Sequence, residues 1–378
     1  MPSDFAIIGG GIIGLTIARE LAMRGASVTV FEKEPELGQH ASGRNSGVLH
    51  AGFYYAPDSL KARLTARGNR LLRDFCAEHD VPVRSCGKVV VASRPDQLPA
   101  LDELARRGQA NGVRLEVIDE KQLADLEPLA RTHERAIWSP DTAVADPKAV
   151  TAALREDLLN HSVELRTGTP VTGPPDAGHV VNAAGLYADK VAQWYGFCDD
   201  YVMMPFKGLY WYGDAHAPHL QRHVYPVPDP RNPFLGVHFT VTATGGVKVG
   251  PTAIPVLSRE AYSMTVRRDE TREVLGAFPA FLRGGHHDVP GLLRSELPKY
   301  SRRWLVHQAR ELVPTAQGFT VKGAPGIRAQ LMHKATGRLE MDFVVRGDER
   351  STHVLNAVSP AWTSSLAFAQ YVVDGIVD

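Results

Sequence analysis

Short apolar runs and amphipathic segments alternate at the start of the chain, in an order that is typical of an α/β protein. Residues 5–8 are wholly apolar, as expected for a buried parallel strand, and the apolar positions of residues 13–22 fall on one face of a helix. Gly25 provides a helix stop, and residues 27–31 have the composition of a second strand that ends at Glu32. The pattern therefore predicts a complete β-α-β unit.

Further along the chain the same criteria separate helices from strands. The predicted helices are 59–80, 97–112, 147–160 and 363–376, and the predicted strands are 89–91, 180–185 (running into a glycine turn) and 353–355. Residues 238–242 and 247–249 alternate around a Gly-Gly pair, which predicts a β-hairpin. The proline-rich segment 221–235 is predicted to be a loop, and residues 262–313 are predicted to be mostly helical.

Together these elements predict an α/β fold with two interleaved domains. A Rossmann-like dinucleotide-binding domain is expected to comprise residues 1–80, 145–205 and 325–378, and an inserted antiparallel α+β substrate domain is expected to comprise residues 81–144 and 206–324. The length of 378 residues is long for a single core, which agrees with this division.

Composition and charge exclude several classes of partner. Lys plus Arg and Asp plus Glu number 42 each, so the charge gives no reason to expect a nucleic acid or an anionic membrane surface as a partner. No signal peptide precedes the first predicted strand, and no apolar run approaches the ~20 residues of a transmembrane helix. We therefore expect a cytoplasmic protein without a transmembrane segment.

The three cysteines, Cys76, Cys86 and Cys198, are odd in number and irregularly spaced. They match neither a disulfide framework nor a CxxC metal pair, so we expect a reducing compartment and no metal site. A disulfide between Cys76 and Cys86 is the less favoured alternative.

A glycine motif lies between the first predicted strand and helix. In Gly9-x-Gly11-x-x-Gly14, the first glycine permits a tight turn, the second lets the backbone approach a pyrophosphate, and the third lets helix and strand pack closely. The helix N-terminus offers unpaired N–H groups to the phosphates, and Glu32 can accept hydrogen bonds from the ribose hydroxyls. A chance glycine loop is the alternative, which the correct flanking elements disfavour.

The next loop indicates which dinucleotide is bound. Residues 41–47 are rich in small and hydroxyl side chains, which suits a pyrophosphate and an isoalloxazine edge, whereas an NAD enzyme needs no second loop here. A carboxylate at Glu32 disfavours NADP, because it would repel the 2′-phosphate. The later glycines at 245–250 lie in the predicted hairpin and open no helix, so FAD alone is the predicted cofactor.

Blocks of sequence along nearly the whole chain are similar to one family. They include RNSGVLHAGFYY at 44–55, SLKA at 59–62, PFKG at 205–208, YPVPDP at 225–230, PFLGVH at 233–238, VGP at 249–251, PGIRAQ at 325–330, DF at 342–343, and NA with SP between 356 and 360. In these blocks the chain resembles the FAD-dependent L-2-hydroxyglutarate dehydrogenase/oxidase family, one of the D-amino-acid-oxidase-like flavoproteins. The resemblance implies a D-amino-acid-oxidase-like fold. It also implies oxidation of the CH–OH group of an L-2-hydroxy acid to the 2-oxo acid by hydride transfer to flavin N5.

Two positions depart from the pattern of that family. Arg44 stands where the family usually has a histidine, which excludes covalent attachment of FAD through a histidine at this position. Trp362 replaces a small residue near the end of the chain. Both changes are expected to reshape the pocket, so the exact substrate is left open.

Oxidation of a 2-hydroxy acid needs a base for the hydroxyl proton and a cation for the carboxylate. His50 is the first candidate for the base, because glycerol-3-phosphate-oxidising flavoproteins have a similar His-Gly-Gly segment, and His238 is the second. Arg328 is the candidate carboxylate clamp, because a guanidinium can form two parallel hydrogen bonds and related flavoproteins have a Gly-x-Arg segment here. Lys207 and Tyr55 are further cavity candidates. Structural roles are the alternative for each of these residues.

The predicted FAD contacts come from the glycine loop, the second loop, a second strand end, Arg328 and the start of the last helix. They are Gly9, Gly11, Ile12, Ile13, Gly14, Glu32, Lys33, Ser42, Arg44, Asn45, Ser46, Gly47, Val48, Ala183, Ala184, Gly185, Arg328, Ser359, Pro360, Thr363 and Ser364. The positive end of the last helix is expected to face the flavin N1–C2=O edge and to stabilise the anionic reduced flavin.

The expected partners are a small-molecule substrate and an electron acceptor, either oxygen or a quinone. An FAD-dependent amino-acid or secondary-amine oxidase is the first alternative, since a neutral amine can deliver hydride without a strong base. An FAD-binding scaffold without redox turnover is the second.

Overall fold

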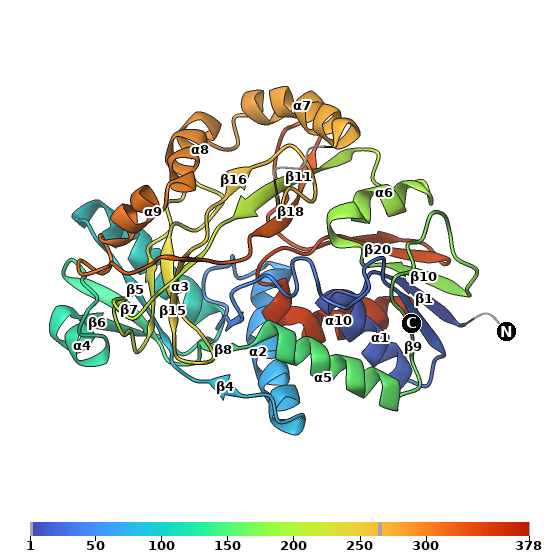
Figure 1. Cartoon of the computed structure of the whole chain (residues 1–378), viewed down its shortest axis with the longest axis horizontal. Helices are drawn as coiled ribbons and strands as arrows, with labels where there is room; N and C mark the ends of the chain where they lie inside the picture. The colour runs from blue at the N-terminus through green and yellow to red at the C-terminus, as the bar shows by residue number, and fades with distance from the viewer. Residues whose placement is uncertain (1–2, 264–266, 378) are drawn as a thin grey trace.

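Four β-sheets and the helices around them make up the computed structural model, which describes residues 3–263 and 267–377. The six-stranded sheet lies at the right of Figure 1 and the eight-stranded sheet at the left. Two long paired strands, β11 (Tyr201–Gly208) and β18 (Gly326–His333), run between them. A third strand, β16 (Ile254–Pro255), joins this central pair.

The six-stranded sheet has the predicted Rossmann-like arrangement. Its order is β19 (Val344–Gly347), β20 (Ser351–Asn356), β10 (His179–Asn182), β1 (Phe5–Ile8), β2 (Val28–Phe31) and β9 (Glu164–Arg166). All neighbours are parallel except β19 and β20. The α/β fold class predicted from the apolar runs is therefore confirmed.

Helices cover this sheet. They are α1 (Ile12–Met23), α2 (Leu60–Glu78), α5 (Pro147–Asn160) and α10 (Ala361–Val377), which pack on one another, and α6 (Ala188–Gln193), which lies on the opposite side in Figure 1. Polar side chains cap the starts of two of these helices. The side chain of Ser59 accepts the N–H of Ala62 at the start of α2, and the side chain of Asp146 accepts the N–H of Lys148 at the start of α5. The predicted helices at 59–80, 147–160 and 363–376 are confirmed to within a few residues.

The eight-stranded sheet holds the predicted hairpin of β14 and β15. Its order is β17 (Val321–Lys322), β12 (Trp211–Tyr212), β15 (Val247–Gly250), β14 (His238–Val241), β13 (His223–Pro226), β5 (Lys88–Val91), β7 (Arg135–Ser139) and β6 (Glu116–Asp119). A smaller sheet is formed by β3 (Val48–Leu49), β8 (Ala143–Ala145) and β4 (Val83–Arg84).

Strand β13 corrects two predictions. The segment 221–235 was expected to be a loop, but residues 223–226 form a central strand because Val224 and Tyr225 are buried in the sheet and the prolines lie only at its end and beyond. In addition, β13 pairs with β5 in parallel, so the sheet is not purely antiparallel. Side-chain burial here outweighs the turn signal of the prolines.

The segment 262–313 is mostly helical, as predicted. It contains α7 (Arg268–Arg283), α8 (Val289–Glu296) and α9 (Arg302–Ala309), while residues 264–266 lie outside the described part. The predicted helix at 97–112 is α3 (Leu98–Ala110), and α4 (Glu120–Leu126) follows it. The limits of the two domains stay a prediction.

The cysteines and the lengths of the apolar helices bear on two of the sequence predictions. All three cysteines are buried free thiols, so the favoured prediction of unpaired cysteines is confirmed. Among the described residues, no helix has the length and apolar character needed to cross a membrane.

Candidate functional site

A cavity of about 1150 Å³ is lined by residues of both large sheets and of the central strands. Its lining includes Gly9, Gly11 and Glu32 (the Glu32 end) and also His50 and Arg328 (the Arg328 end). The volume exceeds the ~300–1,000 Å³ that is usual for drug-sized ligands. It suits a dinucleotide together with a small substrate.

The glycine motif forms the turn between β1 and α1. Gly9 has φ +114°, and a Cβ on Gly9 would lie 2.4 Å from the carbonyl oxygen of Ala183, while a Cβ on Gly14 would lie 2.0 Å from the carbonyl oxygen of Gly9. Only glycine fits at these two positions. The turn therefore presents the start of α1, with Gly11 and Ile12, to the cavity, and no acidic side chain lies in the first turn of this helix.

Glu32 is held at the end of β2 by two backbone amides. Its carboxylate accepts the N–H of Gly10 at 2.7 Å and the N–H of Glu34 at 2.9 Å. A carboxylate has about four acceptor positions, so two more hydrogen bonds can be accepted from a ribose. The carboxylate is thus oriented before any ligand binds.

The second loop is shaped by its own side chains. Asn45 donates to the carbonyl of Ser42 at 2.6 Å and accepts the N–H of Gly47 at 2.7 Å. Ser42 also accepts the N–H of Ile12 at 2.8 Å, which ties this loop to the start of α1. Arg44 donates to the carbonyl of Gln39 at 2.7 Å, so its guanidinium is held along the cavity wall.

The start of α10 meets the loop that contains His50. Thr363 donates to the carbonyl of Val48 at 3.0 Å and accepts the N–H of His50 at 3.1 Å. Asn69 of α2 donates to the carbonyl of His50 at 3.1 Å. The His50 backbone is therefore fixed from two helices.

Most residues predicted to bind the cofactor line this cavity. They are Gly9, Gly11, Ile12, Ile13, Glu32, Lys33, Ser42, Arg44, Asn45, Ser46, Val48, Ala183, Ala184, Gly185, Arg328, Ser359, Pro360 and Thr363. Gly14, Gly47 and Ser364 are not among the lining residues. A Cβ on Gly47 would meet Ala145, and Ser364 packs where α10 crosses Gly68 of α2.

The candidate catalytic residues are brought together with one exception. His50, His238, Tyr55 and Arg328 line the cavity. Lys207 does not: its ammonium donates to the carbonyls of residues 261 and 262. The expectation that Lys207 lies in the cavity is therefore wrong, because side chains alternate along β11 and the neighbouring Phe206 takes the cavity side.

Histidines at this end are held in the neutral form. Burial lowers the pKa of His50 well below its usual value, and the charge of Lys88, when that residue is protonated, lowers that pKa further. Burial lowers the pKa of His238 to about 3. The His238 ring stacks on Tyr225 at 3.8 Å, and its Nδ1 lies 2.8 Å from the carbonyl oxygen of Gly236. Neutral imidazoles can accept a proton, which a base must do.

Arg328 is a cation in the cavity wall that forms no ion pair with the described residues. Its guanidinium carbon lies 4.9 Å from the ring centre of Phe234, and among the described residues no acceptor is hydrogen-bonded to its buried Nη1. Burial lowers the pKa of this guanidinium, but arginine stays charged in proteins. A buried charged donor without a partner points to an anionic ligand.

Several lining residues were missed by the sequence analysis. Lys61 of α2 is buried and lines the cavity, and no ion pair of its ammonium is formed with the described residues. Burial lowers its pKa to about 8. Tyr54, Tyr210 and Tyr225 line the same end. Lys61 and Tyr225 lie within the recognised blocks, but only tertiary structure shows which way each side chain points.

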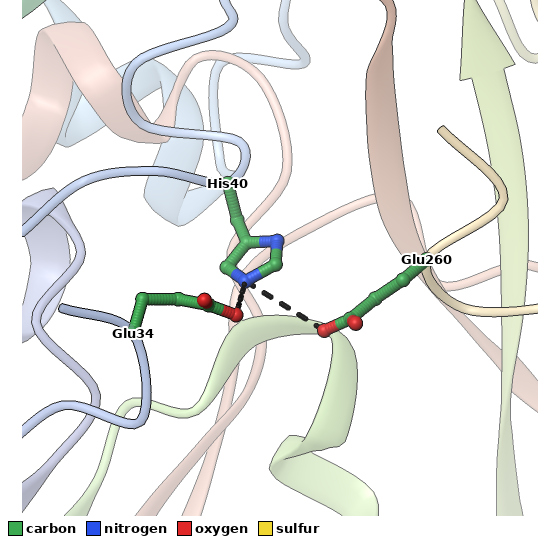
Figure 2. A group of neighbouring side chains, drawn as sticks. All are labelled: Glu34, His40 and Glu260. Atoms are coloured by element: carbon green, nitrogen blue, oxygen red, sulfur yellow. Dashed lines mark hydrogen bonds and ion pairs between the residues drawn. The ribbon is translucent and has the colours of Figure 1, made fainter. Parts of the chain in front are cut away.

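Glu34, His40 and Glu260 form a group of three neighbouring side chains, of which His40 and Glu260 line the cavity. His40 lies between Glu34 and Glu260, with its Nε2 3.0 Å and 3.6 Å from their carboxylates (Figure 2). The ammonium of Lys33 contacts both carboxylates, so the two negative charges already have a cationic partner. This group ties the loop after β2 to the segment after β16.

Comparison with known proteins identifies the family. The model of the family "FAD dependent oxidoreductase" matches residues 4–375. The chain belongs to this family. FAD as the cofactor and an oxidoreductase activity, both predicted from the glycine motif and the second loop, are confirmed for this FAD-dependent oxidoreductase.

Curated relatives extend over nearly the whole chain. The mitochondrial L-2-hydroxyglutarate dehydrogenase of Nematostella vectensis is 36% identical over 98% of this chain and 90% of its own length. The L-2-hydroxyglutarate dehydrogenase of Indibacter alkaliphilus is 36% identical over 99% of this chain and 98% of its own length. The predicted resemblance is thus confirmed. The solved L-α-glycerophosphate oxidase of Mycoplasma pneumoniae, with FAD bound, superposes with a TM-score of 0.80 at 23% identity over 100% of this chain and 95% of its own, which confirms the fold.

The described residues fit FAD. The open start of α1, the turn that only glycine can form, and the two remaining acceptor positions on Glu32 match a pyrophosphate and a ribose. Arg328, with its orphaned Nη1, lines the same cavity, whose volume leaves room for a small substrate.

Proposed function

We propose that this protein oxidises the CH–OH group of L-2-hydroxyglutarate, or of a closely similar L-2-hydroxy acid, to the 2-oxo acid. The observation that carries the proposal is one cavity lined by the glycine loop, by the neutral imidazole of His50 and by Arg328, whose Nη1 has no acceptor among the described residues. These two groups supply the base and the carboxylate site that the reaction needs. The names of the curated relatives support the same substrate class.

The residues proposed to hold FAD follow from the geometry. The backbone at Gly11 and Ile12 would bind the pyrophosphate, and Glu32 would bind the ribose. Thr363 and the start of α10 would lie beside the flavin ring, with the positive end of the helix dipole toward it. When bound, FAD supplies the acceptor for the hydride from C2.

Proton and carboxylate handling belong to the protein. Arg328 would hold the C1 carboxylate through parallel hydrogen bonds, and His50 would accept the hydroxyl proton at Nε2 as C2 gives up its hydride. Lys61 would meet a second carboxylate, which distinguishes a dicarboxylate from a monocarboxylate. Tyr55 and His238 would shape and dehydrate the pocket around the reacting carbon.

Replacing His50 by Asn tests the proposal. Because alcohol oxidation requires removal of the hydroxyl proton, we expect the rate of flavin reduction by L-2-hydroxyglutarate to fall by ~10²-fold or more. His307→Asn, at an exposed histidine, is the control. Fast reduction by amino acids or secondary amines, unaffected by His50→Asn, would instead favour amine oxidation.

The reduced flavin needs an electron acceptor, and the free thiols bear on the location of the protein. We infer that oxygen or a quinone reoxidises the flavin, and that the protein is cytoplasmic, in agreement with its free buried cysteines. Stopped-flow reoxidation by dissolved oxygen and by a soluble quinone analogue would separate the two acceptors.

A further inference from the structure

Lys88 is a fully buried lysine next to the proposed base. Its side chain is 0% exposed, and its Nζ lies 3.4 Å from Nδ1 of His50 and 4.2 Å from the ring centre of Tyr225. Lys88 does not line the cavity, whereas His50 does. The lysine therefore contacts the imidazole from the side of the protein interior.

The groups around Lys88 offer no counter-ion. The titratable side chains around Lys88 come from four places. They are His50 and Tyr54 of the loop after β3, Cys86, His223 and Tyr225 of β13, and His238 of β14. Within the described residues no carboxylate forms an ion pair with Lys88. A buried ammonium without a carboxylate is costly, so the neutral amine is favoured. Burial accordingly lowers the pKa of Lys88 to about 7.

The tautomer of His50 depends on this neighbour. A proton acceptor at Nε2 needs the hydrogen of the neutral ring on Nδ1, and that N–H needs an acceptor of its own. A neutral amine can accept it, whereas an ammonium can only donate. No described residue is hydrogen-bonded to Nε2 of His50, which leaves this atom for the substrate.

We propose that Lys88 is a positioning residue for His50: as a neutral amine it accepts the Nδ1–H and leaves the Nε2 lone pair for the substrate hydroxyl. The inference rests on the proposed function, in which His50 removes that proton. When the substrate O–H bond breaks and the Nε2–H bond forms, the Nδ1 proton can pass to Nζ, so the proton leaves the cavity. The amine becomes an ammonium, and no oxidant or reductant is needed.

This arrangement has a consequence for the dependence of the reaction on pH. When Lys88 is protonated it donates to Nδ1, and Nε2 then bears a hydrogen and cannot act as a base. Flavin reduction should therefore be slow at acidic pH and reach its full rate only when Lys88 has lost its proton.

The test measures the rate of anaerobic flavin reduction by L-2-hydroxyglutarate from acidic to alkaline pH. Lys88→Arg keeps a donor that cannot lose its proton, so the rate should fall by ~10²-fold at every pH. Lys88→Met should be roughly 10-fold slower than the wild type, with its acidic fall in rate abolished. A wild-type pH profile in Lys88→Met, or a wild-type rate in Lys88→Arg, would overturn the proposal.

Lys248→Met is the matched control. Lys248 is also buried in the same sheet, its Nζ lies 4.9 Å from the ring centre of Tyr210, and no hydrogen bond among the described residues joins it to His50. This variant should keep the acidic fall in rate. If the acidic fall in rate also disappears in Lys248→Met, any buried lysine of this sheet would be enough to cause it, and the proposal would be overturned.

A second readout does not depend on turnover. In the ¹⁵N-histidine-labelled holoenzyme, with His50 assigned from the His50→Asn variant, Nδ1 should carry the hydrogen at alkaline pH, and Nε2 should carry it in Lys88→Arg. The same tautomer in both proteins would contradict the proposal. If His50→Asn itself leaves flavin reduction intact, the proposed function fails; if only the Lys88 variants behave as wild type, the inference about Lys88 alone fails.

Discussion

The two ends of the cavity are built from different parts of the polypeptide. The end near Glu32 is made largely of backbone: a turn at Gly9, the open start of α1, and a carboxylate held by two amides. The end near Arg328 is made of side chains from separate strands and helices, and among the described residues Nη1 of Arg328 has no hydrogen-bond acceptor. The first end offers backbone N–H groups and two remaining acceptor positions of a carboxylate to its ligand, whereas the second offers a buried cationic donor that is paired only when an anion binds.

This difference determines what each end tolerates. A site made of backbone is lost when an added side chain displaces that backbone. A site made of buried cations depends on individual charged atoms, because a single unpaired charge in a low-dielectric environment is costly. Substitutions at the two ends should therefore affect different measurements.

Gly14→Val should have the largest effect, at the backbone end. The added side chain would begin 2.0 Å from the carbonyl oxygen of Gly9. Room for it can be made only if β1 and α1 move apart. We expect FAD to be absent from the purified protein and activity to be lost. Absorbance of bound flavin is the measurement, and Gly173→Ala, where no atom lies within 4 Å of a new Cβ, is the control. Normal FAD content in Gly14→Val would disprove the account of this turn.

Arg328→Leu comes next and acts at the other end. Loss of a buried partner for the substrate carboxylate costs several kcal/mol, so kcat/KM for L-2-hydroxyglutarate should fall by ~10³-fold while FAD is retained. Arg346→Leu, which removes a surface arginine paired with Asp200, should change kcat/KM little. Loss of FAD together with activity in Arg328→Leu would mean that the two ends are not separate.

Lys61→Met should have a smaller and selective effect. A charge-assisted hydrogen bond to the second carboxylate contributes ~1.5–3 kcal/mol, so kcat/KM for L-2-hydroxyglutarate should drop ~10- to 100-fold. The value for L-2-hydroxybutyrate, which has no second carboxylate, should stay nearly unchanged. Equal losses for both substrates would assign Lys61 a structural role.

The smallest effect concerns stability against acid. His238 has a folded-state pKa of about 3, below the unfolded value of 6.5, so it is neutral in the folded protein and takes up a proton on unfolding. Its contribution is complete above pH 6.5 and is lost as the pH falls toward 3, by ~1.4 kcal/mol per pH unit. Denaturant unfolding between pH 7 and pH 5.5 should show a shallower loss of stability in His238→Gln than in the wild type. An equal loss of unfolding free energy with falling pH in the two proteins would contradict the lowered pKa of His238.

The contrast between the two ends also explains what could be predicted from the sequence. The hydrogen bonds of the glycine loop to Glu32 and Ser42 join residues at most 30 positions apart, so local spacing indicates them. Tyr225 and Lys88 become neighbours only because β13 pairs in parallel with β5, and no periodicity in a proline-rich segment indicates that pairing. Lys207 was placed wrongly because a recognised block does not tell which side chain of a strand faces the cavity.

The central claim is that the cation-lined end binds and orients an L-2-hydroxy acid for oxidation. Anaerobic titration of the FAD-bound protein with L-2-hydroxyglutarate, with the D-enantiomer as control, tests it most directly. The account predicts that the absorbance of oxidised flavin disappears with the L-enantiomer only, with 2-oxoglutarate formed in an amount equal to the flavin reduced. If the flavin stays oxidised with L-2-hydroxyglutarate and with every other L-2-hydroxy acid tested, the account is contradicted.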